Sequence, residues 1–340
     1  MATPQEEIQQ QAGKVIGQLA GYVGVRAMDM GLRLGMFAEL AKHPEGLTPG
    51  ELAQNLSMDA FYLGVWCNAA LGAEVLDADG DKFKLAPHMD KLLLDQDFPG
   101  YVGGLPTIMV QPELFDTFAT NLPSGKRIWW DECSPEWIQA VSLTARPFYS
   151  RLIPAGIDRV PGLSDVLAGD VKIMDLACGA GVGLQKLAAA YRTATLVGVD
   201  GDAHSLEVTG KKMKEAGLDG RVSLVQSAFE DLDAGDDFDV VIINVSMHEC
   251  RDIDKVTQNV NRTLKPDGYF VISDFPFPAT VDGLRTPPAR VMGGIQFFEA
   301  MIDDQLLPTQ AYVDLLNKHG FKNVDAFDMT PVHAVTYGQK

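Results

Sequence analysis

The segment that most constrains the fold is 171–200, VKIMDLACGAGVGLQKLAAAYRTATLVGVD. Its first apolar run, 171–176, is short and stops at a glycine-rich stretch, which predicts a buried strand. Residues 184–191 then predict a helix, and residues 195–199 predict a second strand with Asp200 at its tip. A unit of this kind binds ligands outside the carboxyl ends of parallel strands, where an acid accepts hydrogen bonds from ribose hydroxyls. The segment therefore predicts a site for a nucleoside-like cofactor.

The turn inside this segment contains three glycines at alternate positions, which let the backbone come close to a ligand. A dinucleotide-binding fingerprint has the spacing G-x-G-x-x-G. Here the spacing is G-x-G-x-G, and Leu184 stands where that fingerprint has its last glycine, so the loop departs from the dinucleotide pattern. The glycines are Gly179, Gly181 and Gly183.

The chain after Asp200 continues to alternate between helix and strand patterns. The apolar run at 238–246 is nearly continuous, which predicts a strand covered on both faces. Such alternation implies a parallel sheet with right-handed crossovers. The other expected elements are helices at 204–217, 253–264, 295–307 and 309–319, strands at 221–227 and 269–275, and a terminal antiparallel pair at 324–330 and 333–339.

The composition of the 340 residues is that of an ordinary soluble globular protein, with 46% hydrophobic and 22% charged residues. The formal net charge of −18 disfavours a nucleic-acid backbone or an anionic membrane as a partner. The first ten residues lack the basic and apolar regions of a signal peptide, and no stretch approaches the roughly 18 uncharged apolar residues of a membrane span. We therefore expect a cytoplasmic protein.

The four cysteines are scattered and include no CxxC pair, which indicates neither a disulfide framework nor a zinc site. The run His248-Glu249-Cys250 could suggest a metal, but adjacent residues at one strand exit do not converge on an ion, so we expect no metal. The other histidines are interpreted as surface or capping residues: His43, His88, His204, His319 and His333.

Residues 1–100 predict a separate, mainly helical domain. Apolar residues recur at helical spacing over 5–23, a second helix is expected over 28–43, and Thr48 caps a short third helix. A helix over 60–76 follows, and then a hairpin with an Asp-Gly turn. Helix, helix and hairpin in this order form a winged-helix pattern.

This winged-helix pattern is not one that reads DNA. In a DNA-binding version the second helix would offer lysine or arginine to phosphates and bases. No lysine or arginine occurs between Ser57 and Leu76, and residues 1–100 contain seven Lys plus Arg against fourteen Asp plus Glu, a net charge of −7. We therefore expect no nucleic-acid partner.

Residues 98–167 are mixed in character, contain several glycine and proline breakers, and are rich in aromatic residues. The loops at 98–150 and 276–308, which would define the substrate, follow no motif. One interpretation is that these rings pack the seam between two domains. The other is that some of them wall an apolar substrate pocket. The pocket hypothesis concerns Trp129, Trp130 and Tyr149, together with Phe297 and Phe298 from a later helix.

The glycine loop and the order of strands resemble the class I S-adenosylmethionine-dependent methyltransferases. DLACGAG at 175–181 is similar to the family motif acid-x-Gly-x-Gly-x-Gly, with Ala177 in the first glycine position. TLKPDGYFVISDF is similar to the family segment L-x-P-G-G-x-x-x-I-x-[DE], and AFEDL is similar to the segment that covers the adenine. The order of parts resembles small-molecule O-methyltransferases of plants and bacteria, in which a winged-helix-like dimerisation domain comes first.

The resemblance implies an α/β fold, a Rossmann-like methyltransferase domain with a seven-stranded, mostly parallel sheet, preceded by a mainly α-helical winged-helix-like domain. The implied boundaries are a dimerisation domain at 1–100, a helical connector at 101–165 that lines the substrate pocket, and a cofactor-binding domain at 166–340. The family further implies a homodimer formed through the N-terminal domain, with S-adenosyl-L-methionine as cofactor and S-adenosyl-L-homocysteine as its product.

The resemblance also implies which side chains meet the cofactor. Ala177, Gly179 and Gly181 would face its methionine portion, and Asp200 its ribose. The family usually has an acid where Ser227 stands, and often a lysine at the position of Asn244. The full implied set is Asp175, Ala177, Gly179, Gly181, Asp200, Gly201, Ser227, Ala228, Phe229 and Asn244.

His248 occupies the position of the family's histidine general base, and Asp274 matches an acid that helps to hold that base. A neutral histidine with an ordinary pKa of about 6.5 can take the proton of an acceptor hydroxyl at pH 7.5. Two family features are missing, because Cys250 replaces a tryptophan and LLP at 306–308 stands where a second acid often precedes the penultimate helix.

We therefore expect an S-adenosylmethionine-dependent methyltransferase that acts on a small, partly apolar acceptor, at oxygen, with His248 as general base. One alternative is transfer to N, C or S by proximity, in which His248 only positions the acceptor. Another is a regulator that binds the cofactor without using it, against which the acidic second helix of the winged-helix pattern argues. We expect no membrane partner.

Overall fold

The computed structural model describes residues 3–129 and 132–340, and these form two compact units. The first unit comprises the chain up to Pro112 together with Pro135–Thr144, and the second comprises Glu113–Ser134 and Ala145–Lys340. The division falls inside helix α8 (Pro135–Arg151). The domain boundaries at 100 and 165 stay predictions.

The first unit begins with one long helix, α1 (Pro4–Arg33), where the sequence predicted two helices. Thr3 starts it with a capping box, since its hydroxyl accepts from the backbone N–H of Glu6 while the Glu6 carboxylate accepts from the N–H of Thr3. No breaker separates the two predicted helices, so they merge. The break comes at Gly35, whose φ of 75° lets the chain turn into α2 (Met36–Leu40).

The winged-helix pattern is present in this unit. Helix α3 (Pro49–Leu56) starts at Thr48 with the predicted cap, α4 (Ala60–Gly72) follows, and β1 (Leu76–Asp79) pairs antiparallel with β2 (Lys82–Leu85). The two-residue turn consists of Gly80 and Asp81, one position later than predicted, with Gly80 at positive φ. The Trp66 indole N–H donates to the Ala27 carbonyl at 2.9 Å and ties α4 to α1 in the core.

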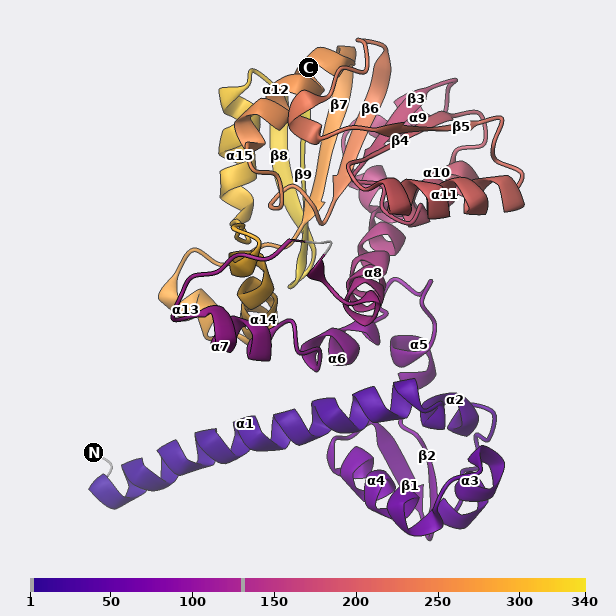
Figure 1. Ribbon diagram of the computed structural model, residues 1–340, viewed down its shortest axis with the longest axis vertical. Coiled ribbons are helices and arrows are strands. Elements are labelled where there is room, and N and C mark those ends of the chain that lie inside the picture. Colours follow the sequence, from indigo (N-terminus) through magenta and orange to yellow (C-terminus); the bar gives the residue numbers. More distant parts are fainter. Residues whose placement is uncertain (1–2, 130–131) are drawn as a thin grey trace. The chain divides into compact units, whose positions relative to one another are not determined.

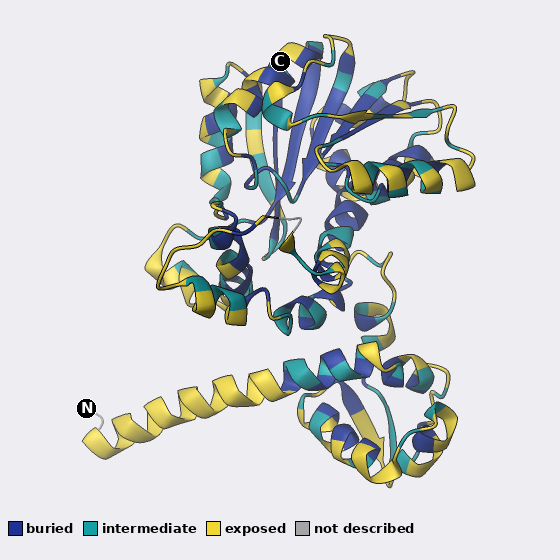
Figure 2. Ribbon diagram, viewed as in Figure 1, coloured by how far each residue is buried: buried dark blue, intermediate teal, exposed yellow. Residues whose placement is uncertain are grey.

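The N-terminal part of α1 is exposed in the described structure (Figure 2). Its apolar stripe faces outward, from Ile8 at 69% exposure to Val23 at 54%. Phe61 and Tyr62 on α4 are also exposed, at 76% and 74%. An isolated helix in water is marginally stable, so an apolar helical stripe of this length needs a cover.

The second unit is built on a seven-stranded sheet of strand order β5-β4-β3-β6-β7-β9-β8 (Figure 1). All pairs are parallel except β7–β9 and β8–β9, which are antiparallel. This is the predicted mostly parallel sheet. The strands are β3 (Lys172–Leu176), β4 (Thr195–Asp200), β5 (Val222–Gln226), β6 (Phe238–Asn244), β7 (Leu264–Asp274), β8 (Lys322–Thr330) and β9 (His333–Gln339).

Helices cover both faces of the sheet, because alternate strand residues are apolar on both sides. Ile173 of β3 belongs to a core shared with α10 (Val182–Ala190), α11 (Ala203–Glu215) and α9 (Leu163–Leu167). Its neighbour Met174 belongs to the opposite core, shared with α12 (Ile253–Thr263) and α15 (Thr309–Lys318). Because β3, β6 and β7 run parallel to one another, their carboxyl ends meet at one edge of the sheet.

One helix differs from the sequence prediction in position. The expected helix at 295–307 starts earlier, at Pro287, and ends at Met301, forming α14 (Pro287–Met301). Thr286 is the N-cap residue, and a proline at the first helical position favours the start of a helix there. Residues 287–294 are therefore helical, although their proline and glycine content is typical of a loop. The remaining elements are α5 (Met89–Leu93), α6 (Gly104–Met109), α7 (Phe115–Asn121), η2 (Leu152–Gly156), η3 (Ile157–Arg159), η4 (Phe229–Asp231) and α13 (Val281–Leu284).

Across the ranges that the structure describes, no helix combines the length and the apolar character needed to cross a membrane.

Candidate active site

The end of β3 places an acid beneath the glycine loop. Asp175 is fully buried, and one of its oxygens accepts from the Tyr149 hydroxyl at 2.9 Å. The other oxygen, Oδ2, accepts no hydrogen bond in the described structure. Burial raises the pKa of Asp175 to about 7. A Cβ at Gly183 would lie 2.3 Å from both Asp175 and Tyr149, so this glycine is needed for close packing under the loop.

The loop itself turns through three residues with positive φ, Ala177 at 63°, Gly179 at 47° and Gly181 at 79°. Ala177, in the family's first glycine position, therefore adopts the backbone conformation that favours glycine. The Thr209 hydroxyl donates to the Gly179 carbonyl at 2.7 Å and holds the loop from α11. A Cβ at Gly179 would meet nothing within 4 Å, so the loop is open at this position.

Asp200, at the tip of β4, is joined to the glycine loop. Its Oδ2 accepts from the Gly179 N–H at 2.8 Å, and its Oδ1 accepts from the Asp202 N–H at 2.9 Å. Burial raises the pKa of Asp200, although these backbone donors lower it. The neighbouring Gly201 is exposed. The predicted ribose acid thus lies beside the predicted methionine loop, with lone pairs left for a ligand.

The predicted adenine segment follows β5. The backbone N–H of Ser227 donates to the Asp200 carbonyl at 3.1 Å, which places this segment next to the ribose acid. Asn259 on α12 fixes the turn that follows Ala228, because its amide donates to the carbonyls of Phe229 and Glu230 at 3.0 and 2.8 Å.

Asn244 ends β6 and is 3% exposed. Its Oδ1 accepts from the Ser273 hydroxyl at 2.7 Å, whereas its Nδ2 has no hydrogen-bond acceptor in the described structure. The Ser273 oxygen lies 2.8 Å from His333 Nε2, and the Arg151 guanidinium donates to His333 Nδ1 at 2.9 Å. An unused buried donor at the edge where ligands bind fits a residue that contacts the cofactor.

His333 was expected at the surface or in a helix cap, and this expectation is wrong. It is fully buried in the chain of hydrogen bonds from Arg151 to Asn244. Burial and the nearby Arg151 charge hold the pKa of His333 well below its usual range, so the ring is neutral. Its position on β9, next to β7, comes from long-range strand pairing that no local pattern reports.

His248 and Asp274 are brought together as predicted. Both are buried, at 4% and 2% exposure, and His248 Nδ1 lies 2.8 Å from Asp274 Oδ1 and 3.0 Å from Oδ2. The Tyr312 hydroxyl donates to Asp274 Oδ2 at 2.9 Å, and the Phe275 N–H donates to Oδ1 at 2.8 Å. Asp274 is thus fixed from α15 and from its own strand end, and it orients the imidazole so that Nε2 is left for a ligand.

A second acid, which the sequence did not predict, faces the other ring nitrogen. Glu299 on α14 is 4% exposed, and its Oε2 lies 3.8 Å from His248 Nε2. Glu249 joins them, since ligand atoms of His248, Glu249 and Glu299 all lie within 4.8 Å of one another. Burial, followed by the Glu299 charge, raises the pKa of Glu249 to about 8. Three side chains here could share one small ligand group or a cation, and the expectation of no metal stays a prediction.

The acids change the expected chemistry of His248. Burial by itself lowers the pKa of His248, but the charges of Asp274 and Glu299 outweigh burial and hold that pKa well above its usual range. The expectation of an ordinary histidine pKa is therefore wrong. Asp274 was visible at the end of a predicted strand, whereas Glu299 comes from a helix whose predicted start was eight residues too late.

The aromatic residues of the predicted substrate pocket lie in different surroundings. Trp129 is 45% exposed and stacks under the Arg251 guanidinium at 4.2 Å, and Trp130 lies outside the described residues. Phe297 is 38% exposed and packs edge-on against Phe115 and Phe118, whereas its neighbour Phe298 is buried at 1% exposure. Tyr149 supports Asp175. Their role in an acceptor pocket stays a prediction.

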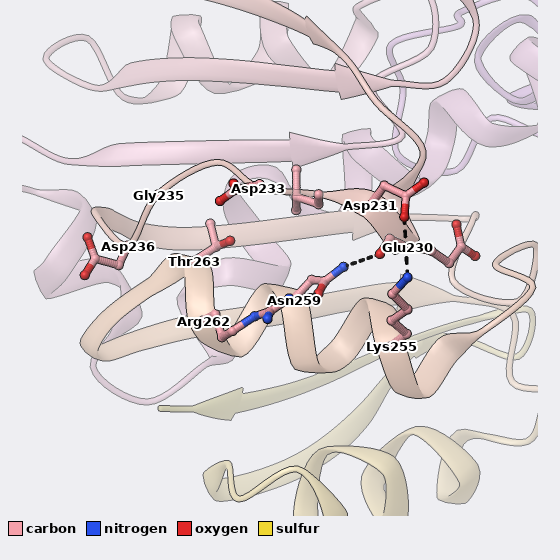
Figure 3. A pocket seen from close by; sticks show the side chains of 10 residues that line it. Glu230, Asp231, Asp233, Gly235, Asp236, Lys255, Asn259, Arg262 and Thr263 are labelled. Atoms are coloured by element: carbon pink, nitrogen blue, oxygen red, sulfur yellow. Dashed lines mark hydrogen bonds and ion pairs between the residues drawn. The ribbon is translucent and has the colours of Figure 1, made fainter.

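A hollow of about 650 Å³ lies elsewhere, between η4 and α12 (Figure 3). Acids and two basic residues line it, and an ion pair joins Lys255 to Asp231 at 3.4 Å. Asn259 points from α12 toward Glu230 in this view. None of the predicted site residues lines this hollow.

Comparison with known families matches residues 167–305 to a family described as a methyltransferase domain. A ubiquinone/menaquinone biosynthesis C-methyltransferase of Syntrophotalea carbinolica is 34% identical over 134 residues, which are 38% of this chain and 56% of that protein. A C-methyltransferase of the same description from Citrifermentans bemidjiense is 27% identical over 59% of this chain and 95% of its own length. The chain thus spans little more than half of the first of these relatives.

Solved structures resemble the whole chain at low sequence identity. A putative O-methyltransferase of Nostoc punctiforme has a TM-score of 0.73 at 18% identity, with all of both chains covered. Human N-acetylserotonin methyltransferase in complex with S-adenosylmethionine has a TM-score of 0.68 at 15% identity and covers 97% of this chain and 98% of its own. Identity at this level shows the fold alone.

Together these findings confirm the predicted resemblance and the predicted fold class. The chain carries a methyltransferase domain, and its α/β fold is that of the class I methyltransferases, with a mainly helical N-terminal part. The match over residues 167–305 supports the prediction of an enzyme of the methyltransferase class, and the activity of the whole chain belongs to the proposal below. The roles of individual residues stay predictions.

Proposed function

We propose that this chain, a class I methyltransferase by its fold and its methyltransferase domain, transfers a methyl group from S-adenosylmethionine to the oxygen of a small, partly apolar acceptor. The observation that carries the proposal is the buried His248–Asp274 pair at 2.8 Å, at the sheet edge that also bears the glycine loop. The proposal is tested by methyl transfer from labelled S-adenosylmethionine to a panel of phenols and alcohols.

Three features support S-adenosylmethionine as the methyl donor. The loop is open at Gly179, Asp200 keeps lone pairs for ribose hydroxyls, and Asn244 has an unused buried amide donor. Solved structures of similar fold include one with S-adenosylmethionine and one, PigF, with S-adenosylhomocysteine. We assign Asp175, Ala177, Gly181, Gly201, Ser227, Ala228 and Phe229 to the same site as supporting contacts.

When bound, S-adenosylmethionine supplies a methyl group on a positively charged sulfur, which is open to in-line displacement. The protein's main contribution is to hold the acceptor oxygen in line with that methyl group. A hydroxyl is a poor nucleophile while protonated, so His248 Nε2 takes its proton as the new C–O bond forms. Asp274 fixes the tautomer with Nδ1–H and stabilises the imidazolium that results.

A second candidate is transfer to carbon. The sequence relatives named above are C-methyltransferases, which favours this alternative, although they match only part of the chain or at 27% identity. Transfer to carbon, nitrogen or sulfur by proximity would leave His248 as a positioning residue. A regulator that binds the cofactor without using it is a weaker alternative, because the acidic winged-helix pattern has no basic second helix.

The rate of methyl transfer should rise with pH above the ordinary titration range of histidine. His248 acts as a base only when neutral, and the Asp274 and Glu299 charges, against the effect of burial, keep it protonated well above about pH 6.5. Asp274→Asn removes one raising charge, so its kcat/KM profile should move to lower pH. The measurement is kcat/KM against pH for both proteins, and an unchanged midpoint in Asp274→Asn would contradict the base assignment.

We also propose a homodimer formed through the N-terminal unit. The apolar stripe of α1 is exposed among the described residues of the first unit, and Phe61 and Tyr62 on α4 add exposed rings to the same unit. A second copy offers the same stripe, so the two can cover each other in a symmetric interface. We also propose a cytoplasmic location, as the scattered cysteines of the sequence favour.

Light scattering at micromolar concentration should give about twice the 36.9 kDa mass of one chain. Leu19→Glu, which places a charge in the exposed stripe, should shift the protein toward monomer, while Gln10→Glu on the polar side should not. A wild-type mass near that of one chain would contradict this proposal.

No binding of a random DNA duplex is expected at physiological salt.

A further inference from the structure

Glu299 is a buried carboxylate that the proposed proton transfer does not use. Its Oε2 accepts no hydrogen bond in the described structure. His248 Nε2 lies 3.8 Å from this oxygen, which is too long for a hydrogen bond. Leaving a carboxylate oxygen buried without a donor is costly.

The distance of 3.8 Å between His248 Nε2 and Glu299 Oε2 suits a ligand with two neighbouring donors. Two hydroxyl or amino groups on adjacent carbons lie about as far apart as two hydrogen-bonded atoms, which is clearly closer than 3.8 Å. One of them can therefore donate to His248 Nε2 while its neighbour donates to Glu299 Oε2. The Nε2 position is where the proposed function puts the methylated hydroxyl. Glu299 is therefore placed to accept from the next substituent of the same molecule.

The surrounding charges favour a donor at this position. Glu249 lies within reach of the same point, and burial and the Glu299 charge raise its pKa to about 8, so two acids crowd this point. Asp304, close to Glu299 along the chain, also has its pKa raised to about 7 by burial and by Glu299. A ligand that donates a hydrogen bond to Glu299 relieves this excess of buried acid, whereas an ether or a carbonyl oxygen adds repulsion.

We propose that Glu299 selects acceptors that carry a second hydrogen-bond donor, a hydroxyl or an amino group, on the carbon next to the one that bears the methylated hydroxyl. The proposal rests on the proposed methyl transfer to an oxygen held beside His248. A donor at Glu299 also partly neutralises the charge that faces Nε2, which helps His248 to lose its own proton before it receives that of the acceptor.

The test uses catechol, which has the neighbouring hydroxyl, and phenol, which lacks it. For the wild-type protein, kcat/KM and affinity for catechol should exceed those for phenol by about 10- to 100-fold, the size of a hydrogen bond to a charged group. Glu299→Gln preserves size but removes the charge, and it should abolish most of this preference while the affinity for phenol changes little. The pH profile of kcat/KM should move to lower pH for both acceptors, because the Glu299 charge also raises the pKa of His248. Glu215→Gln, an exposed acid at the end of α11, is the matched control and should keep the preference.

Three results would overturn the proposal. Equal losses for catechol and phenol in Glu299→Gln would mean that Glu299 acts only through His248 or through stability. One equivalent of a divalent metal in the purified protein, lost in Glu299→Gln, would make Glu299 a metal ligand. No preference in the wild-type protein, including binding of neither probe, would also contradict it.

Failure of the proposed function gives a different result. In that case the protein shows no S-adenosylmethionine binding and no transfer to any probe. Calorimetry of catechol and phenol with the protein alone then still reports on Glu299, because the preference is a property of the acid and not of the methyl donor.

Discussion

Replacing His248 with Ala should lower kcat by roughly 10²–10⁴ while the affinity for S-adenosylmethionine barely changes. The reason is that Nε2 takes the proton of the acceptor while Asp274 holds the ring. The Tyr312 hydroxyl, which also contacts Asp274, is already used as a donor to it. Asp274→Asn should cost less, because the ring remains and only its orientation and charge stabilisation suffer. The measurement is single-turnover methyl transfer, together with calorimetry for the donor.

The matched control for this variant is His88→Asn. His88 is exposed in the first unit and adopts a positive φ of 66°, which Asn tolerates. Its kcat should equal that of the wild-type protein. If His248→Ala keeps near-full kcat on its true acceptor, then holding the reactants together is sufficient for the reaction. Transfer to carbon, nitrogen or sulfur then becomes the better interpretation.

Replacing Asp200 with Ala should weaken binding of S-adenosylmethionine and its demethylated product by about 1.5–3 kcal/mol, or roughly 10- to 150-fold. The carboxylate is expected to accept from the ribose, and it also holds the Gly179 N–H at 2.8 Å, so its loss also loosens the glycine loop. Isothermal titration calorimetry with both compounds measures the change.

Asp236→Ala removes an exposed acid in the loop before β6 and should leave affinity unchanged. Wild-type protein with micromolar affinity for the donor, about −8 kcal/mol, is the starting point of the comparison. Tight binding of a nicotinamide dinucleotide without any binding of S-adenosylmethionine would overturn the cofactor assignment, despite the G-x-G-x-G spacing of the loop.

The sequence by itself determined the mostly parallel sheet and the position of the glycine loop. Strand and helix patterns around 171–200 fall within two residues of β3, α10 and β4, because short apolar runs and glycine turns are local signals. His248 and Asp274 could be paired in advance for a related reason. Both follow strands that are neighbours in a parallel sheet, so their ends meet at one edge.

Only the tertiary structure decided what surrounds those residues. Glu299 lies 51 residues after His248 in the chain, and His333 comes from the antiparallel strand β9, so neither is linked to the site by any local spacing. The pKa of His248 depends on those distant charges and on burial, which sequence patterns do not report. The apolar stripe of α1 shows the same limit, because its periodicity predicts a helix with one apolar face but does not say whether the same chain covers that face.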